Sequence, residues 1–376
     1  MMKILMTTDS VGGIWNYSLE LAAALSRSGV RIILATMGPP PSAAQIAAAS
    51  AVPDLSLRLS TYALEWMPDP WEDVARAGEW LLDIDRAERP DVIHLNHFAF
   101  GPLPWLAPAV MVAHGCALSW WTAVHRTRPP AELNRYRDAV RRGLTAADLV
   151  IAPTASLVEM MRPHYLRFPH ARVIYHAVSP APFRSDILPG DRAHVVFSAG
   201  RLWDEGRNFG ALRTIAETLE WPVRVAGLPA NSHQRGGGAG NIEGAGSVAA
   251  GRIQALGVLE PAEVAAEMKR ASVYVLPALY EPFGLSAMEA AHAGCALVLG
   301  DIPTLREVWQ NAAVFVAPDD VRSLHTAVDT LMRDEGLRTC LADRAYQRAL
   351  CFRTSDMAAS YMDAYAAVAH SRELLV

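Results

Sequence analysis

Two glutamates, Glu281 and Glu289, stand eight residues apart in the segment YEPFGLSAMEAAHAGCALVLGD. Between them lie a Phe283-Gly284 turn and Ser286, which together with Glu289 has the form of a capping box and predicts a helix that begins near Ser286. The N–H groups and positive dipole end of such a helix bind anions, and a glycine lets backbone approach a ligand closely. The segment therefore indicates either a phosphate site with a carboxylate on each side or an ordinary capped helix in which Glu289 serves the cap.

Two arginines, Arg201 and Arg207, follow another predicted strand in the segment SAGRLWDEGRN. They could neutralise a diphosphate, or they could be surface residues of a chain that has only two lysines among its 34 basic residues. This turn and the Phe283-Gly284 turn end different strands of one predicted sheet. We therefore expect basic and acidic groups to meet at the carboxyl edge of that sheet.

A plain Gly-Gly turn, Gly12-Gly13, follows the first predicted strand and precedes a helix. It lacks the G-x-G-x-x-G pattern, and ATMGPPP rather than an acid follows the second strand, so NAD is disfavoured. The Asp-x-Asp sequence formed by Asp83 and Asp85 falls within a predicted helix. We expect these two aspartates to be solvated surface.

Predicted strands and helices alternate along the chain, which is typical of parallel sheets with helices on both faces. The Pro-rich stretch SPAPFRSDILPGD interrupts the series before HVVFSAGR begins a second one, and it marks a boundary between two doubly wound domains. We expect domains over residues 1–180 and 181–355 and a last helix over 356–376. The predicted strands include 3–8, 30–36, 92–95, 109–113, 149–151, 223–226, 273–276, 296–299 and 314–316, and the predicted helices include 14–28, 71–88 and 131–145.

Composition fits two globular domains. The chain has 376 residues, of which 51% are hydrophobic and 19% charged, so each half can bury a core. A formal net charge of −5 gives no reason to expect nucleic acid as a partner. The four cysteines are scattered, and the apolar stretch before Asp9 is too short for a secretory signal, so we expect a cytoplasmic protein. The Gly-rich segment at 233–251 is predicted to be a mobile loop.

The Gly-Gly loop, VAHG, SAGRLWDEGRN, YEPFGLSAMEAAHAGCALVLGD and REVWQNAAVFVAPDD together resemble a known family. The chain is similar to retaining glycosyltransferases of family 4, and the acid-turn-acid segment is highly specific whereas Gly-Gly is not. The resemblance implies an α/β fold of GT-B architecture, in which two doubly wound Rossmann-like domains face a central cleft and a C-terminal helix crosses back to the first domain. It also implies that the second domain holds a nucleotide-sugar donor and the first domain an acceptor.

The resemblance implies roles for residues of the acid-turn-acid segment. Glu281 corresponds to the acid that contacts the hydroxyls of the donor sugar, and Glu289 to the acid that binds the ribose hydroxyls. The distal phosphate is expected at the backbone N–H groups of the turn and helix start. That donor-binding stretch comprises Phe283, Gly284, Leu285 and Ser286.

Basic and N-terminal residues complete the site that the resemblance implies. Arg201 and Arg207 correspond to the pair that neutralises the diphosphate leaving group, although Arg207 stands where the family usually has lysine. His114 corresponds to a histidine near the anomeric carbon, and Gly12 and Gly13 to a loop that closes over the diphosphate. The implied route retains anomeric configuration and needs neither metal nor cofactor, and UDP is the expected nucleotide because it is frequent in the family.

The acceptor is not identified by the sequence and could be a glycan, a lipid or a small molecule. Trp15, Trp120 and Trp121 lie near the expected site in sequence and could stack on an acceptor or pack in the core. A basic amphipathic helix near 131–145 could contact an anionic acceptor or the inner face of a membrane, or it could pack on the core. In the loop VIYHAVSPAPF, His176 and its neighbours replace the polar groups usual in the family, so no role is carried onto that loop.

Two other classes of function are compatible with a two-domain α/β architecture. A nucleotide-sugar epimerase would transform the donor without an acceptor, and the EPFGLSAMEA segment favours transfer over that reaction. A non-catalytic sugar-binding protein of the periplasmic kind is disfavoured because no signal peptide is evident and because the two arginines are paired.

Overall fold

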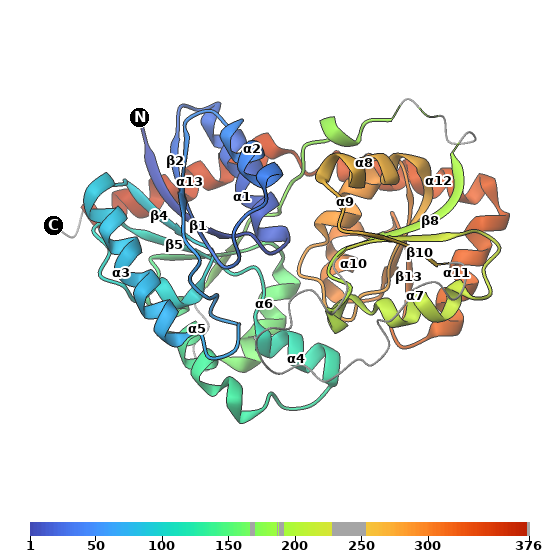
Figure 1. The fold of residues 1–376 in the computed structure, drawn as a ribbon, viewed down its shortest axis with the longest axis horizontal. Helices are drawn as coiled ribbons and strands as arrows, with labels where there is room; N and C mark the ends of the chain where they lie inside the picture. Colours follow the sequence, from blue (N-terminus) through green and yellow to red (C-terminus); the bar gives the residue numbers. More distant parts are fainter. Residues whose placement is uncertain (166–169, 186, 188–191, 228–252, 374–376) are drawn as a thin grey trace. The chain divides into compact units, whose positions relative to one another are not determined.

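The computed structural model of the chain describes residues 1–165, 170–185, 187, 192–227 and 253–373 (Figure 1). The loop predicted at 233–251 lies outside these ranges. The chain divides into an N-terminal unit, Met1–Ala177 with Arg353–Val376, and a C-terminal unit, Val178–Phe352. The sequence places its boundaries after residues 180 and 355, and the structural division falls after residues 177 and 352.

The N-terminal unit contains a seven-stranded parallel sheet in the order β3-β2-β1-β4-β5-β6-β7. Its inner strands are short apolar runs, and every residue of β4 and β5 is buried, as expected for strands with both faces covered. The chain winds outward from β1 in one direction and then restarts at β4 in the other. The carboxyl ends of β1 and β4 therefore form the topological switch point, where ligands of such sheets bind. The strands are β1 Lys3–Asp9, β2 Arg31–Met37, β3 Leu55–Leu59, β4 Val92–Leu95, β5 Ala109–Val112, β6 Leu149–Ala152 and β7 Ala171–Val173.

The last helix of the chain, α13 (Thr354–Glu373), belongs to the N-terminal unit and packs against α1 and β5. Figure 1 shows this helix in red beside the blue elements that begin the chain. Its Tyr361 and Tyr365 are fully buried there, which confirms the predicted return of the C-terminal helix. The other helices of this unit are α1 Gly13–Ser26, α2 Ala43–Ser50, α3 Trp71–Glu88, α4 Ala117–His125, α5 Asn134–Ala146 and α6 Ala155–Met161, with 3₁₀ turns η1 Phe98–Phe100, η2 Ala131–Leu133 and η3 Arg162–His164.

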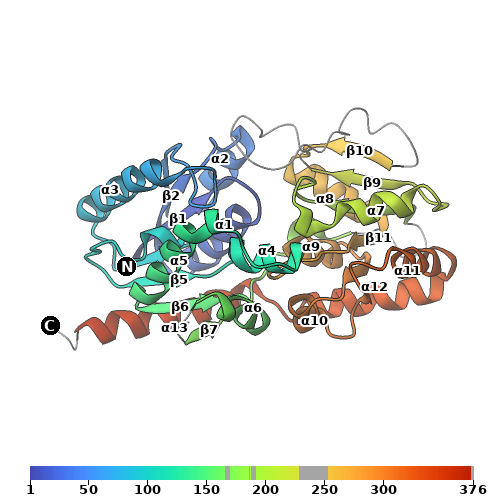
Figure 2. The same cartoon turned by 90° about the horizontal axis from the view of Figure 1, so that it is seen from below.

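The C-terminal unit contains a six-stranded parallel sheet in the order β10-β9-β8-β11-β12-β13. Figure 2 shows β9 and β10 side by side toward one edge of it. The switch point of this sheet lies between β8 and β11, because the chain first winds outward through β9 and β10 and then restarts at β11. The strands are β8 Ala193–Ala199, β9 Val223–Ala226, β10 Ile253–Gly257, β11 Ala271–Leu276, β12 Ala296–Gly300 and β13 Val314–Val316. The helices are α7 Phe209–Ala216, α8 Pro261–Arg270, α9 Leu285–His292, α10 Pro303–Trp309, α11 Val321–Arg333 and α12 Glu335–Ala349, with 3₁₀ turns η4 Ala181–Phe183 and η6 Glu205–Arg207.

Both sheets confirm the predicted α/β class with two doubly wound units. Within the described ranges, no helix combines the length and the apolar character that crossing a membrane requires.

Helix α5 packs closely on η1 through a glycine. A Cβ atom added to Gly143 would lie 2.0 Å from the carbonyl oxygen of Phe98, so backbone must move to accept any side chain. We expect Gly143→Ala to lower the free energy of unfolding by about 1–3 kcal/mol, as overpacking of a core does. Gly210 is the matched control, because its added Cβ would meet nothing within 4 Å on α7. Urea denaturation should find Gly210→Ala neutral or stabilising; equal stability of the two variants would contradict this packing.

Candidate active site

The turns that follow β8 and β11 meet at the switch point of the C-terminal unit. The N–H groups of Leu279 and Tyr280 donate to the carbonyl oxygen of Gly206 at 2.9 and 3.1 Å, which joins the two turns through backbone. Asn208 adds a side-chain link, because its Nδ2 donates to the carbonyls of Pro277 at 2.9 Å and Pro318 at 2.7 Å. The structure therefore brings the SAGRLWDEGRN and YEPFGLS segments together.

Arg207 and Glu281 form a largely buried ion pair within these turns. The Nη1 atom of Arg207 lies 2.6 Å from Oε2 of Glu281, and the two side chains are 22% and 9% exposed. The contact is electrostatic, since Nη1 has no hydrogen-bond partner of suitable geometry in the described part of the chain. Burial alone would lower the pKa of Arg207, but Glu281, and after it Tyr274, Asp204 and Glu289, raise that pKa above its ordinary value. The guanidinium is thus a permanent cation among acidic groups.

Glu281 also orders the turn that precedes α9. Its Oε1 accepts from the N–H of Gly284 at 3.0 Å and more weakly from that of Phe283 at 3.4 Å. Its carbonyl oxygen accepts from Thr304 Oγ1 at 2.6 Å. Phe283 is 2% exposed and packs edge-on against Phe352, so its ring anchors the turn in the core.

The predicted capping box at the start of α9 is wrong. The helix begins at Leu285 and its N-cap is Gly284, whose φ of 92° is left-handed and which makes no side-chain cap bond. Glu281, not Ser286 or Glu289, takes up the N–H groups of the turn. Among the described residues, no acceptor faces the N–H groups of Leu285 and Ser286, and Glu289 on the first turns of α9 is partly exposed.

Arg201 lies in the same turn as Arg207 but is tied to a different acid. Its Nη2 donates to Oδ2 of Asp204 at 2.9 Å, and its guanidinium lies over the ring of Trp203. Asp204 in turn accepts from the N–H of Gly206 at 2.9 Å through Oδ1. A small cavity of about 10 Å³ is lined by Arg201 and Arg207. Asp204 was not singled out in the sequence, where only its place in a polar turn could have indicated it.

In the N-terminal unit, Gly12 and Gly13 follow β1 at the switch point. Both are exposed, and Gly12 has a φ of 100°, which favours glycine. The preceding Asp9 is buried, and its Oδ1 accepts from the N–H of Val11 at 2.8 Å. The Gly-Gly turn is therefore an exposed helix start, and the buried carboxylate of Asp9 fixes the backbone just before it.

His114 follows β5 and belongs to a largely buried group of imidazoles, phenols and one amide, which we call the His–Tyr cluster. Its Nε2 lies 2.8 Å from Oδ1 of Asn96, and its Nδ1 lies 3.2 Å from Nε2 of His176. The cluster consists of Tyr17, His94, Asn96, His114, His176, Tyr361 and Tyr365. His176 is a residue onto which the sequence placed no role, and no local pattern joins it to His114.

The histidines of the His–Tyr cluster are neutral at pH 7. Burial lowers the pKa of His94 to about 3. Burial, and after it repulsion from His94, lowers the pKa of His176 to about 3. Burial and then the neighbouring His176, His94 and His97 lower the pKa of His114 well below its ordinary value. The ring of His114 is nonetheless partly exposed.

The three tryptophans singled out in the sequence differ in exposure. Trp15 is 2% exposed on α1, so its ring packs in the core and does not face an acceptor, contrary to one of the two predicted uses. Trp120 and Trp121 are partly exposed on α4, where the Trp121 ring centroid lies 4.2 Å from that of His125. These two rings stay candidates for an acceptor contact.

The predicted basic helix corresponds to η2 and α5 and buries its apolar stripe, including Tyr136, Val140 and Leu144. The packed face leaves Arg141 and Arg142 exposed, as one of the predicted alternatives requires. A membrane or anionic acceptor on that exposed face stays a prediction.

The expectation that Asp83 and Asp85 are both solvated is wrong for Asp85. Asp83 is exposed, whereas Asp85 is 1% exposed and its Oδ2 accepts from the N–H of Leu106 at 3.0 Å. Helix periodicity explains the difference, because residues two apart face different sides of α3.

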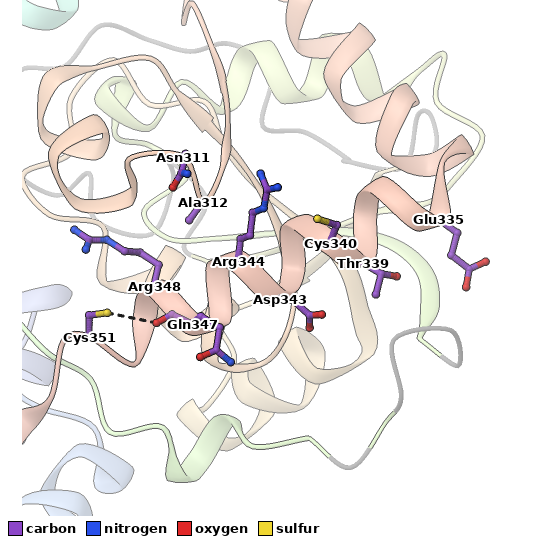
Figure 3. A pocket seen from close by; sticks show the side chains of 11 residues that line it. Asn311, Ala312, Glu335, Thr339, Cys340, Asp343, Arg344, Gln347, Arg348 and Cys351 are labelled. Carbon is purple, nitrogen blue, oxygen red and sulfur yellow. Dashed lines mark hydrogen bonds between the residues drawn. The ribbon is translucent and has the colours of Figure 1, made fainter.

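A wide surface hollow of about 1160 Å³ runs along α12 in the C-terminal unit (Figure 3). Its labelled side chains include Cys340, Asp343 and Arg344. None of the residues predicted for the site lines it. The hollow is therefore separate from the strand-end groups described above.

Comparison with known proteins identifies the family. The family model described as Glycosyltransferase Family 4 matches residues 11–181, and the model described as Glycosyl transferases group 1 matches residues 249–348. The chain belongs to the family 4 type of glycosyltransferases. Known sequences match parts of this chain. A glycogen synthase of Mycobacterium tuberculosis is 42% identical over 95 residues, which are 25% of this chain and 23% of that protein. A phosphatidyl-myo-inositol mannosyltransferase of Mycolicibacterium smegmatis is 33% identical over 122 residues, 32% of each chain.

Solved structures share the fold over nearly the whole glycosyltransferase chain. Sucrose-phosphate synthase from Thermosynechococcus elongatus has a TM-score of 0.79 at 19% identity and covers 100% of this chain and 99% of its own. Anabaena Alr3699/HepE in complex with UDP-glucose has a TM-score of 0.73 at 16% identity and covers 98% and 100%. These likenesses establish the GT-B architecture that the sequence predicted.

Proposed function

We propose that this glycosyltransferase is retaining and metal-independent, and that it moves a sugar from a nucleotide-sugar donor to an acceptor hydroxyl. The observation that carries the proposal is the buried Arg207–Glu281 pair at the switch point of the C-terminal unit, beside the start of α9. UDP-sugar is the proposed donor, which the complex of the Anabaena structure with UDP-glucose supports. The acceptor can be a glycan, a lipid or a small molecule.

The C-terminal unit is the proposed donor-binding domain. Loss of the nucleoside diphosphate leaves negative charge on its phosphates, and fixed positive groups lower the barrier to that loss. Arg201 and Arg207 supply guanidinium charge, and the N–H groups of Leu285 and Ser286 supply the positive end of a helix dipole. These groups can perform the role that a divalent cation would otherwise have.

The carboxylates are proposed to bind hydroxyl groups. Glu281, fixed by Arg207 and by the turn, accepts hydrogen bonds from the donor sugar, and Glu289 accepts them from the ribose. A phosphate oxygen of the donor takes the acceptor proton on the same face from which the diphosphate leaves, which retains configuration. The N-terminal unit contributes the acceptor side, with His114 and the Gly12-Gly13 turn as its site residues.

The proposal predicts nucleotide binding without a metal. In a thermal-shift panel with EDTA, UDP and UDP-sugars should raise the melting temperature by several degrees, because a ligand at one hundred times its Kd stabilises by about 2.7 kcal/mol. Glu289→Gln should weaken UDP binding about tenfold or more with little change in the melting temperature of the unliganded protein, because glutamine keeps the length of the side chain and an acceptor oxygen and loses only the charge.

The exposed Glu217 beside α7 gives a matched control, since Glu217→Gln should change neither quantity. A shift with NAD(H) alone, or none with any nucleotide at millimolar concentration, would remove the donor site.

A further inference from the structure

His114 contacts two polar groups that come from different parts of the N-terminal unit. Asn96 follows β4 and places Oδ1 2.8 Å from Nε2 of His114. His176 lies in the loop after β7 and places Nε2 3.2 Å from Nδ1 of His114. Both ring nitrogens of His114 are therefore within hydrogen-bonding distance of a buried partner.

The orientation of Asn96 decides which nitrogen of His114 carries the proton. Nδ2 of Asn96 donates to the carbonyl oxygen of Thr7 at 2.6 Å, and a carbonyl can only accept. The oxygen Oδ1 is consequently the atom that faces His114, and it too can only accept. Nε2 of His114 must then be the protonated nitrogen, an assignment that follows from the hydrogen-bond network.

The same logic assigns the proton of His176. A neutral imidazole protonated at Nε2 has a lone pair at Nδ1, so His114 accepts at Nδ1 and His176 donates from its own Nε2. The ring of Tyr17 packs against both imidazoles, with centroids 4.6 Å from His114 and 4.4 Å from His176. Rotation of either ring would break a hydrogen bond and disturb this packing.

We propose that His176 is a positioning residue for His114: together with Asn96 it fixes the tautomer and orientation of that imidazole, so that His114 serves sugar transfer as a neutral, immobile group and not as a proton carrier. The inference rests on the proposed function for its catalytic part, since it assigns His114 to the transfer site. The tautomer itself does not depend on that function. Burial, which holds the histidine pKa values low, agrees with a neutral pair.

Nitrogen NMR of the full chain labelled at histidine tests the tautomer. Long-range proton–nitrogen spectra, assigned with His114→Asn, should show His114 protonated at Nε2 and hydrogen-bonded at Nδ1. His176→Leu should move the Nδ1 resonance of His114 to the position of a nitrogen without a donor. His176→Gln should leave it nearly unchanged, because the amide nitrogen of glutamine can replace Nε2 as the donor. A proton on Nδ1, or no response to His176→Leu, would overturn the inference.

Release of UDP from UDP-glucose with water as acceptor tests the catalytic part. In this reaction the bond from the anomeric carbon to the phosphate oxygen breaks, water oxygen bonds to that carbon, and UDP and a proton leave. His176→Leu should reduce kcat about tenfold at unchanged KM, the effect of one lost hydrogen bond, and His176→Gln should restore it. The exposed His170→Leu is the matched control and should have the unaltered rate.

The two variants separate positioning from simple stabilisation. A fall in melting temperature without a fall in kcat for His176→Leu, or an equal loss of kcat for His176→Gln, would overturn the positioning role. No UDP release by the unaltered protein would instead contradict the proposed function and remove the catalytic part of the inference, whereas the NMR result would still decide the tautomer.

Discussion

Arg207→Ala is expected to slow UDP release from a UDP-sugar by about 10²–10³-fold, the usual cost of removing one preorganised group that stabilises developing negative charge. The largest effect is expected at Arg207, because its guanidinium is largely buried and lies 2.6 Å from Glu281. Arg207→Lys keeps the charge but loses the planar fork, so its rate should fall by less than about tenfold. Steady-state rates at saturating donor measure both. Arg213→Ala on α7 is the control, since that arginine is exposed; equal rates for arginine, lysine and alanine at position 207 would show that Arg207 takes no part in transfer.

Stability must be measured beside this rate, because Arg207→Ala leaves Glu281 buried without its counterion. Breaking a buried ion pair costs about 3–5 kcal/mol, whereas neutralising both partners is often nearly neutral. The double variant Arg207→Met with Glu281→Gln should therefore regain most of the lost stability in urea denaturation and none of the lost rate. Recovery of the rate would mean that the pair is structural only.

The free energy of unfolding is expected to fall steeply as the pH is lowered from about 6.5 toward 4, the unfolded histidine pKa setting the upper limit. His94 and His176 have pKa values of about 3 in the folded protein, and that of His114 is also lowered. Between these values and 6.5 the unfolded chain binds protons that the folded chain excludes, so stability rises with pH across this window and is lost below it. The expected loss is about 2 kcal/mol at pH 5 for each of His94 and His176.

One buried acid opposes this trend. Burial raises the pKa of Glu65, so the folded protein binds the carboxyl proton more tightly than the unfolded chain does. The contribution of Glu65 to the free energy of unfolding therefore falls as the pH rises. The histidines outnumber it, and the net slope stays positive. Urea titrations between pH 7 and 5, followed by tryptophan fluorescence, measure the slope. His94→Gln should lower the slope of the free energy of unfolding against pH by the equivalent of about one bound proton, whereas the exposed His170→Gln should leave it unchanged. A free energy of unfolding that is constant from pH 7 to 5 would contradict the neutral cluster.

Sequence patterns predicted most elements that have a clear apolar run or a long helical period, and they missed short elements with few buried residues. The helix predicted over 71–88 is α3, and the strands predicted over 92–95, 223–226 and 314–316 have the bounds of β4, β9 and β13. The edge strands β3 and β7 were not predicted, because none of their residues is fully buried and their apolar runs are weak. Short helices such as α2 and α4 were missed for a similar reason, since few of their residues face the core.

For the candidate site, the sequence could predict only contacts between residues that are close in the chain or that follow adjacent strands. The meeting of Arg207 and Glu281 follows from strand order, which alternation of elements indicates. The capping box failed because a left-handed Gly284 turned the N–H groups toward Glu281 rather than Ser286, and dihedral angles are not visible in a residue pattern. His176 was missed because its partner lies 62 residues away in the chain.

The return of α13 to the N-terminal unit has a consequence for synthesis on the ribosome. Domains usually fold in the order in which they emerge, the N-terminal one first. Here Tyr361 and Tyr365 lie in the core of the N-terminal unit and bond with Tyr17 on α1 and His94 on β4, so that core is incomplete until α13 has emerged from the ribosome. The C-terminal unit, Val178–Phe352, has all its strands before then. The part of the protein that is made first is therefore the part that must finish folding last.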